Sequence, residues 1–266
     1  MTQDQRTPFQ RPKTWDARKD NYEHTTEALT GLFVEQILDA AVVGEGFRVL
    51  DVAAGTGAVS IAAVRRGATV EAIDFSSGMV DRLRERLAEL RIDDRVNARV
   101  MDGQALAFPD ASFDAVCSNF GTVFFPDPAA GLREMHRVLR PGGRAVITGW
   151  TQAGDWVNWI RHAWQTALPE VAVNLGGTRF SDPELMRGCY VEAGFAHPEV
   201  STAHATRETT MEWVLANYST MVMAIGRLPA DQREKIDRAF ANLLGERFGD
   251  ANPTFRLEAN LGVGVR

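Results

Sequence analysis

The sequence predicts an α/β fold in which helices cover both faces of a doubly wound, mostly parallel sheet. Five short apolar runs occur between residues 48 and 150, and helical patterns lie between them. The runs are almost continuously apolar, which is typical of strands buried on both faces of a parallel sheet. The 266 residues exceed the ~150 of an average domain, so we expect one large domain or a core with additions.

Each element of this core has a local signal. The expected strands are 48–53, 69–74, 96–102, 113–119 and 144–150. The helix between the first two strands ends near Gly67, because glycine suits the residue just after a helix. Ser76 or Ser77 caps the helix between the second and third strands. A helix over 128–139 starts at Pro128 and stops at the Pro-Gly-Gly run that begins at Pro141.

The flanking segments carry helical patterns as well. Apolar spacing predicts helices over 22–42, 154–173, 181–193, 208–226 and 229–248, and strands over 195–204 and in the alternating tail. The predicted organisation is an N-terminal arm and helix that form part of a cap (1–45), the sheet core (46–150), a cap insertion (151–180), a core helix and strand (181–207), a helical cap insertion (208–250) and a final strand (251–266).

Composition excludes several classes of protein. Lys and Arg number 29 and Asp and Glu 35, and the net charge of −6 argues against nucleic acid or an anionic membrane as partner. No uncharged apolar run of about 18 residues occurs, and the polar first twenty residues lack the apolar region of a secretory signal. Cys117 and Cys189 have no ligand-like spacing, so we expect no disulfide framework, no metal and a cytoplasmic location.

A glycine-containing turn follows the first strand. Gly55 and Gly57 lie where the strand ends and a helix begins, a place where a ligand approaches the backbone and free N–H groups. A tight turn without a ligand explains a lone Gly-x-Gly equally well. A dinucleotide fingerprint needs a third glycine, and Ser60 occupies that position, which weakens an NAD interpretation.

Three aspartates end three successive strands. Asp51, Asp74 and Asp102 therefore lie at the edge where open parallel sheets bind ligands. Asp74 suits a ribose diol, although capping of the next helix is the alternative for it. Asp102 suits an exocyclic adenine amine, with Met101 packed on the ring, although a solvated aspartate is the commoner outcome.

Residues 48–150 resemble the class I S-adenosylmethionine-dependent methyltransferases. VLDVAAGTG resembles their first motif, VEAIDFS the second, MDGQALAFPDASFDAV the third and EMHRVLRPGGRAVITGW the closing motif. The run is most similar to the ubiquinone/menaquinone-biosynthesis-like (methyltransferase type 11) branch. The resemblance implies a Rossmann-like seven-stranded sheet with a helical cap, and it implies little about residues 151–250.

The resemblance also implies S-adenosylmethionine as cofactor and a set of residues that hold it. The loop before Gly57 would meet the methionine part, Asp74 the ribose, Asp102 the adenine, and Asn119 the region near the sulfonium. The family often has glycine where this chain has Ala53. The complete predicted set is Asp51, Ala53, Gly55, Thr56, Gly57, Asp74, Phe75, Ser76, Met79, Met101, Asp102, Gly103 and Asn119.

Aromatic residues outside the motifs are candidates for an acceptor pocket. The predicted pocket residues are Trp15, Tyr22, Phe120, Phe124, Trp156 and Trp159. Core packing is the more common outcome for a tryptophan-rich helix such as 154–173. Catalytic residues stay unknown: His24, His162 and Tyr22 are candidate bases, although a lone histidine is more often structural or solvated.

The predicted function is methyl transfer from S-adenosylmethionine to a small apolar or aromatic molecule by in-line displacement. The acceptor atom stays open, with oxygen or carbon favoured by the resemblance. Alternatives are a protein that binds the cofactor for other chemistry, such as a cyclisation or elimination, and an NAD(P)-dependent oxidoreductase. A homodimer is left open. The arm, 151–180 and 208–250 are expected to close the acceptor pocket over the strand ends, unless 208–250 packs on the sheet edge or forms a dimer contact.

Overall fold

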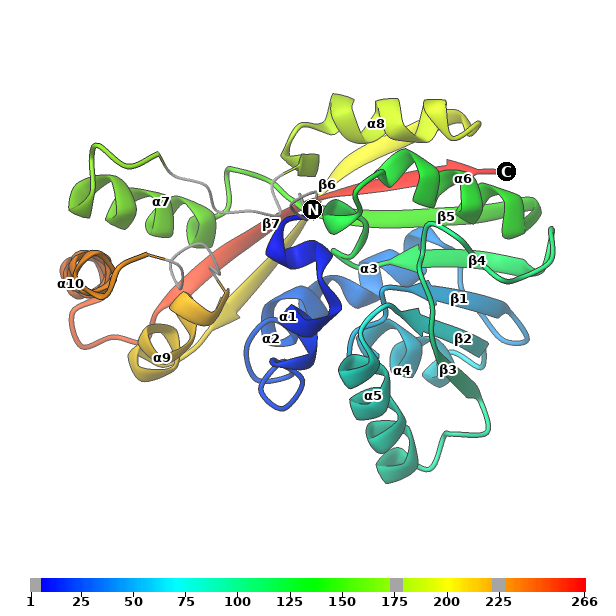
Figure 1. The fold of residues 1–266 in the computed structure, drawn as a ribbon, viewed down its shortest axis with the longest axis horizontal. Coiled ribbons are helices and arrows are strands. Elements are labelled where there is room, and N and C mark those ends of the chain that lie inside the picture. The colour runs from blue at the N-terminus through cyan, green and yellow to red at the C-terminus, as the bar shows by residue number, and fades with distance from the viewer. Residues whose placement is uncertain (1–5, 173–178, 222–227) are drawn as a thin grey trace, which may run out of the picture.

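The computed structural model describes residues 6–172, 179–221 and 228–266. Its centre is one seven-stranded sheet in the order β3-β2-β1-β4-β5-β7-β6, in which β7 is antiparallel to both neighbours (Figure 1). The predicted mostly parallel α/β sheet is therefore confirmed. The strands are β1 (Arg48–Val52), β2 (Thr69–Asp74), β3 (Val96–Val100), β4 (Phe113–Ser118), β5 (Leu139–Trp150), β6 (Ala196–Glu208) and β7 (Thr254–Val265).

Helices cover both faces of the sheet because both faces are apolar. In β1, Val49 joins the apolar cluster of one face, and Leu50 and Val52 join that of the other. The first face is covered by α3 (Val34–Ala40), α4 (Ala58–Arg65) and α5 (Ser77–Leu90). The second is covered by α6 (Pro128–Val138) and α8 (Pro183–Glu192).

The helix caps agree with the sequence signals. The hydroxyl of Ser76 accepts a hydrogen bond from the Met79 N–H, as an N-cap residue does. Gly67 follows α4 with a φ of +87°, a left-handed conformation that glycine adopts without strain. One predicted boundary is wrong, because β5 starts at Leu139, before the Pro-Gly-Gly run, where Leu139 pairs with Phe113 of β4.

The N-terminal region is broken into short pieces rather than one helix over 22–42. It contains η1 (Pro8–Gln10), α1 (Pro12–Asp16), α2 (Glu27–Thr30) and η2 (Gly31–Phe33) before α3 begins. The hydroxyl of Thr25 donates to the carbonyl of Asn21, and that of Thr30 to the carbonyl of Thr26. Such bonds compete with regular helix formation, so the apolar spacing alone overestimates the length of the helix.

The remaining helices lie along the far ends of β6 and β7 (Figure 1). They are α7 (Asp155–Ala167), α9 (Met211–Met221) and α10 (Ala230–Phe248), with a short turn η4 (Arg179–Ser181) before α8. The expected helix 154–173 stops at Ala167, and part of the expected helix 208–226 falls outside the described residues. Among the described helices, none combines the length and the apolar character that a membrane span requires.

Candidate functional site

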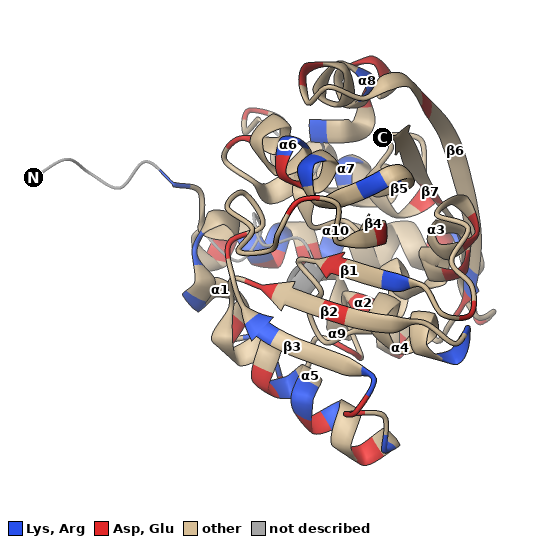
Figure 2. Ribbon diagram, turned by 90° about the vertical axis from the view of Figure 1, so that its right-hand side faces the viewer, with Lys and Arg blue, Asp and Glu red and all other residues tan. Residues whose placement is uncertain are grey.

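A cavity of about 490 Å³ lies at the carboxyl ends of β1 to β4, beneath the N-terminal arm. Figure 2 shows the arrowheads of β1, β2 and β3 directed toward α1, with acidic residues at the tips of β1 and β2. Nine predicted cofactor residues line the cavity: Ala53, Gly55, Asp74, Phe75, Met79, Met101, Asp102, Gly103 and Asn119. Its size is in the usual range for a small-molecule site.

The turn between β1 and α4 adopts an unusual backbone conformation. Ala53, Gly55 and Gly57 all have positive φ, at +57°, +55° and +95°. A Cβ on Gly55 would come within 3.3 Å of the Tyr22 ring, so the arm packs directly on the turn. A Cβ on Gly57 would overlap the Leu83 side chain instead. Gly57 therefore allows α5 to pack closely and does not line the cavity.

We expect Ala53→Gly to stabilise the protein by about 0.5–1 kcal/mol, because it removes a side chain from a left-handed residue. The matched control is Ala62→Gly in the right-handed α4, which should instead lose about 1 kcal/mol. Urea unfolding of the two variants beside the wild type measures both changes. Equal destabilisation by both substitutions would show that the turn is not strained at Ala53.

Two buried carboxylates support this turn. Asp74 accepts hydrogen bonds from the N–H groups of Gly55 and Ser76, both at 2.9 Å. Burial raises its pKa to about 6, although these N–H groups act in the opposite direction. Asp51 accepts from the hydroxyl of Ser60 at 2.6 Å and from its N–H at 3.0 Å, and burial raises its pKa to about 7. Ser60, where a dinucleotide fingerprint would have glycine, thus provides a hydroxyl to a buried acid.

Of the other predicted cofactor residues, some line the cavity and some lie behind its wall. Asn119 lines the cavity, and its amide is fixed by the Thr30 carbonyl and the Thr148 hydroxyl, both at 3.0 Å. Asp51 borders a small adjoining pocket rather than the large cavity. Thr56 and Ser76 are buried and do not line the cavity. The Thr56 hydroxyl donates a hydrogen bond to Glu27, and the Ser76 hydroxyl caps α5.

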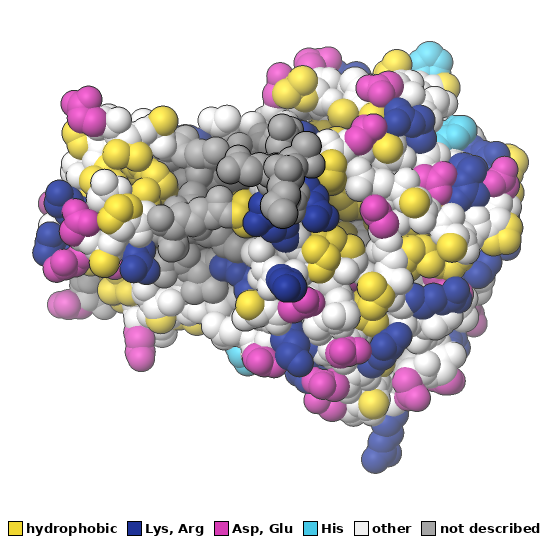
Figure 3. Space-filling view, viewed as in Figure 1, with side chains coloured by type: hydrophobic (Ala, Val, Ile, Leu, Met, Phe, Trp, Pro, Cys, Tyr) yellow, Lys and Arg dark blue, Asp and Glu magenta, His cyan; other side chains and the backbone are white. Residues whose placement is uncertain are grey.

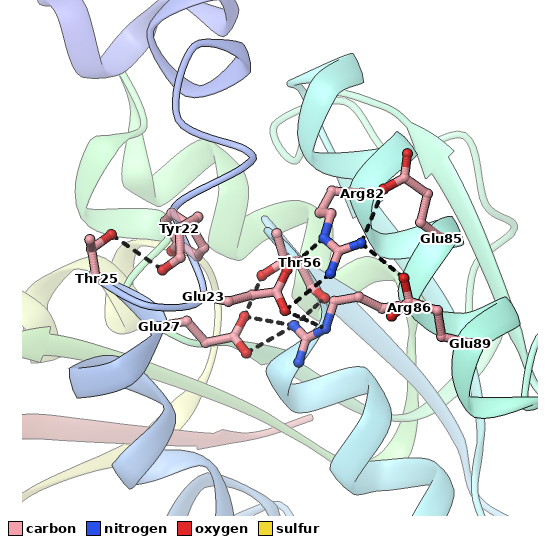
Figure 4. Close-up of polar contacts among 9 residues, drawn as sticks. All are labelled: Tyr22, Glu23, Thr25, Glu27, Thr56, Arg82, Glu85, Arg86 and Glu89. Carbon is pink, nitrogen blue, oxygen red and sulfur yellow. Dashed lines mark hydrogen bonds and ion pairs between the residues drawn. The ribbon is translucent and has the colours of Figure 1, made fainter.

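Ion pairs hold the N-terminal arm to α5 (Figure 4). Glu23 bonds Arg82 at 2.7 Å and also lies 3.2 Å from Arg86. Glu27 pairs with Arg86 at 2.9 Å, and Arg86 donates to the Thr56 carbonyl at 2.7 Å. These contacts connect the arm to the turn between β1 and α4, which forms one wall of the cavity.

The start of the arm is held by a carboxylate and by aromatic packing. Asp16 accepts from the Ser76 hydroxyl at 2.6 Å and from the Gly78 N–H at 2.9 Å. Phe9 stacks on Phe124 at a centroid distance of 4.9 Å, and Trp15 lies 5.3 Å from the same ring. The start of the arm is thus packed over the cavity, and Phe9 and Trp15 line it.

Five of the predicted acceptor residues line the cavity, namely Trp15, Tyr22, Phe120, Phe124 and Trp156. Sequence reasoning missed Phe9 in the arm and Ile160. Trp150, which stacks on Phe120 at 4.2 Å, also lines the cavity. An aromatic residue within a polar arm was the available signal for Phe9.

Several predicted site residues lie elsewhere. Trp159 packs between Phe248 and Phe255 under Arg247, so its inclusion in the pocket is wrong. His24 and His162 are exposed and do not line the cavity. No described residue of 208–250 lines it either, because α10 packs against α7, with Phe240 against Trp156. Within the described ranges, no group of three His, Cys, Asp or Glu side chains is arranged to hold a metal.

Comparison with known families agrees with this geometry. The family described as "Methyltransferase domain" matches residues 50–147, the span from β1 to β5. Residues 50–147 are therefore similar to a methyltransferase domain. A demethylmenaquinone methyltransferase from Clavibacter sepedonicus is 51% identical over 108 residues, and the match covers 41% of this chain and 42% of that relative. The chain therefore spans less than half of the length of that relative.

Solved structures extend the likeness beyond residues 50–147. The Bacillus subtilis protein YcgJ has a TM-score of 0.59 at 20% identity, covering 88% of this chain and 97% of its own. The (4+2) cyclase SpnF has a TM-score of 0.57 at 20% identity, covering 88% of this chain and 81% of its own. At these identities the likeness establishes a shared fold alone.

Proposed function

We propose that this protein transfers a methyl group from S-adenosylmethionine to a small apolar or aromatic molecule. The observation that carries the proposal is Asp74, a buried carboxylate that ends β2 and lines the cavity beside the turn of the methyltransferase domain. When bound, the cofactor supplies a methyl group on a sulfonium, which an acceptor takes with its own electron pair while the pair of the broken bond stays on sulfur.

The residues present fit this cofactor. Asp74 would accept hydrogen bonds from the ribose hydroxyls, as carboxylates at this strand end do. Phe75, Met79 and Met101 give the apolar walls that an adenine ring requires, and Asp102 lies beside them for its amine. Asn119, fixed by two hydrogen bonds, would face the methionine part.

The acceptor side of the cavity supports an apolar or aromatic substrate. Phe9, Trp15, Phe120, Phe124 and Trp156 form its walls. A relative named demethylmenaquinone methyltransferase points to the same class of acceptor. The net charge of −6 argues against nucleic acid, and the cysteine usage favours the cytoplasm.

We expect wild-type protein to bind S-adenosylmethionine and Asp74→Asn to bind it 10–100-fold more weakly. The loss corresponds to about 1.4–2.8 kcal/mol, which is the scale of charge-assisted hydrogen bonds to a carboxylate. Titration calorimetry measures both affinities, and the exposed Asp102→Asn is the control with a smaller expected loss. Release of S-adenosylhomocysteine in an acceptor screen then separates methyl transfer from other uses of the cofactor. Folded wild-type protein that binds NADH and not S-adenosylmethionine would overturn the proposal.

A further inference from the structure

The acceptor side of the cavity has few ionisable side chains. Among the described lining residues, those outside the strand ends that we assign to the cofactor include Arg6, Arg18 and Tyr22 and no His, Lys, Glu or Cys. Residues 1–5, 173–178 and 222–227 contain Asp4 and Arg227 as their only ionisable side chains. The rest of this side is mostly aromatic or aliphatic, and its uncharged polar residues include Gln10, Thr26 and Thr30.

None of the described lining groups is placed to remove a proton from an acceptor. Burial raises the pKa of Tyr22 well above neutrality, with the nearby Glu27 carboxylate acting in the same direction, so its phenol keeps its proton. Both oxygens of Asp74 accept backbone hydrogen bonds at 2.9 Å. Asp102 lies beyond the end of β3, on the cofactor side, where one oxygen accepts from the Gln104 N–H. Methyl transfer here therefore requires an acceptor that is nucleophilic without help.

Two cationic side chains, Arg6 and Arg18, line the cavity, although the whole chain is acidic. Figure 3 shows Lys and Arg side chains gathered at the centre of this face, around the first described residues. Arg6, Arg11 and Lys13 are exposed, and Arg6 also lines the cavity. Arg179 donates to the carbonyl of Phe125, a residue of the cavity wall, at 2.8 Å. Arg6 and Arg18 line the cavity away from Asp74 and Asp102 at the strand ends, so an anion bound on this side would meet their positive charge.

We propose that the acceptor is an aromatic acid that enters the cavity already ionised, with its negative charge held by Arg18 and Arg6. This inference rests on the proposed function and deepens it by naming the charge state of the substrate. An ionised acceptor requires no base from the protein, which agrees with the absence of one among the described lining residues. Aromatic walls favour such a reaction because an anion and a sulfonium lose their charges as they react. On this proposal, a neutral alcohol and a protonated amine are not acceptors.

Two isosteric probes test the charge preference without requiring turnover. 2-Naphthoate carries a carboxylate, and 2-naphthamide has the same ring and nearly the same shape without the charge. Their affinities for the full chain, with and without S-adenosylhomocysteine, follow from quenching of tryptophan fluorescence, since Trp15, Trp150 and Trp156 line the cavity. We expect 2-naphthoate to bind at least tenfold more tightly than 2-naphthamide.

Arginine variants then locate the charge that the probe senses. Arg18→Gln and Arg6→Gln should each reduce the preference for 2-naphthoate, and the double variant should abolish it, while binding of 2-naphthamide changes less than twofold. Arg18→Lys should retain part of the preference because it keeps the charge. The control is Arg238→Gln on the exposed face of α10, whose arginine pairs only with Glu234 among the described residues, and it should behave as the wild type.

Three results would overturn the inference. They are equal binding of the two probes, no binding of either probe to protein that binds S-adenosylhomocysteine, and loss of S-adenosylhomocysteine binding in Arg18→Gln with an unchanged preference for 2-naphthoate. The third would assign the guanidinium to the cofactor. Failure of the proposed function gives a different result. Folded protein that does not bind S-adenosylhomocysteine would contradict the proposed function, whereas the preference between the two probes is measured separately, in the absence of S-adenosylhomocysteine.

Discussion

Replacing Arg86 with alanine is expected to release the N-terminal arm and to weaken S-adenosylmethionine binding at least tenfold. The Arg86 side chain is only 18% exposed, and its partners Glu27 and Glu23 are 14% and 23% exposed. Removing the cation leaves two carboxylates close together beside the turn that ends β1. Removing one partner of a buried ion pair costs about 3–5 kcal/mol of stability. Because these side chains are partly exposed and solvent screens their charges, we expect a loss of about 2–3 kcal/mol here.

We expect this loss to appear locally rather than as global unfolding. The contacts of the arm with the rest of the molecule include the ion pairs to α5, the Asp16 bonds, a few aromatic rings and a hydrogen bond from the Trp213 indole to the His24 carbonyl, and we expect the arm to open at lower cost than the sheet. Hydrogen exchange in residues 6–26 should quicken by one to two orders of magnitude, while exchange in β1 and β4 stays unchanged. The control Arg238→Ala removes an exposed pair on α10 and should leave both exchange and cofactor affinity as in the wild type. Unchanged exchange of the arm in Arg86→Ala would show that these ion pairs do not hold it.

The sheet core could be predicted because its signals are local. Each strand of the core is a short apolar run. Ser76 marks a helix start because its hydroxyl accepts a hydrogen bond from the first turn, and Pro128 marks another because it has no N–H that would need a partner there. The acids at the strand ends follow from the topology, since parallel strands bring their carboxyl ends to one edge. Asp74 therefore lies at the cavity, as its position in the sequence indicates.

The arm and the cap could not be predicted in the same detail because their roles depend on distant partners. Trp156 and Trp159 belong to the same apolar stripe of α7, yet only Trp156 lines the cavity, since Phe248 and Phe255 cover Trp159. No periodicity within α7 distinguishes the two. Likewise, Asp51 and Asp74 have similar sequence contexts, and only the structure shows that Ser60 satisfies Asp51 behind the cavity.

Unfolding free energy of the ligand-free protein is expected to fall as pH rises from 5 to 8. Asp51 and Asp74 have folded pKa values raised by burial to about 7 and about 6, from an ordinary value of 3.8. A carboxyl group with a raised folded pKa contributes its full stability below the unfolded pKa and loses it as pH rises through the folded pKa. For each group, every pH unit between its unfolded and folded pKa changes the unfolding free energy by about 1.4 kcal/mol. The two groups together therefore account for a loss on the order of 2–4 kcal/mol between pH 5 and pH 8.

The variant Asp51→Asn isolates this effect, because the amide keeps a similar shape and an oxygen that accepts from Ser60. Urea unfolding at pH 5, 6, 7 and 8 should show a clearly shallower decline in this variant than in the wild type. His136, whose pKa is lowered by burial, adds stability as pH rises, but it is common to both proteins and cancels in the difference. Affinity for S-adenosylmethionine should change in the opposite direction, rising from pH 5 to 7.5, because the ionised form of Asp74 is the better acceptor for ribose hydroxyls. Parallel pH profiles of stability in the two proteins would mean that Asp51 titrates at its ordinary pKa and that its burial carries no electrostatic cost.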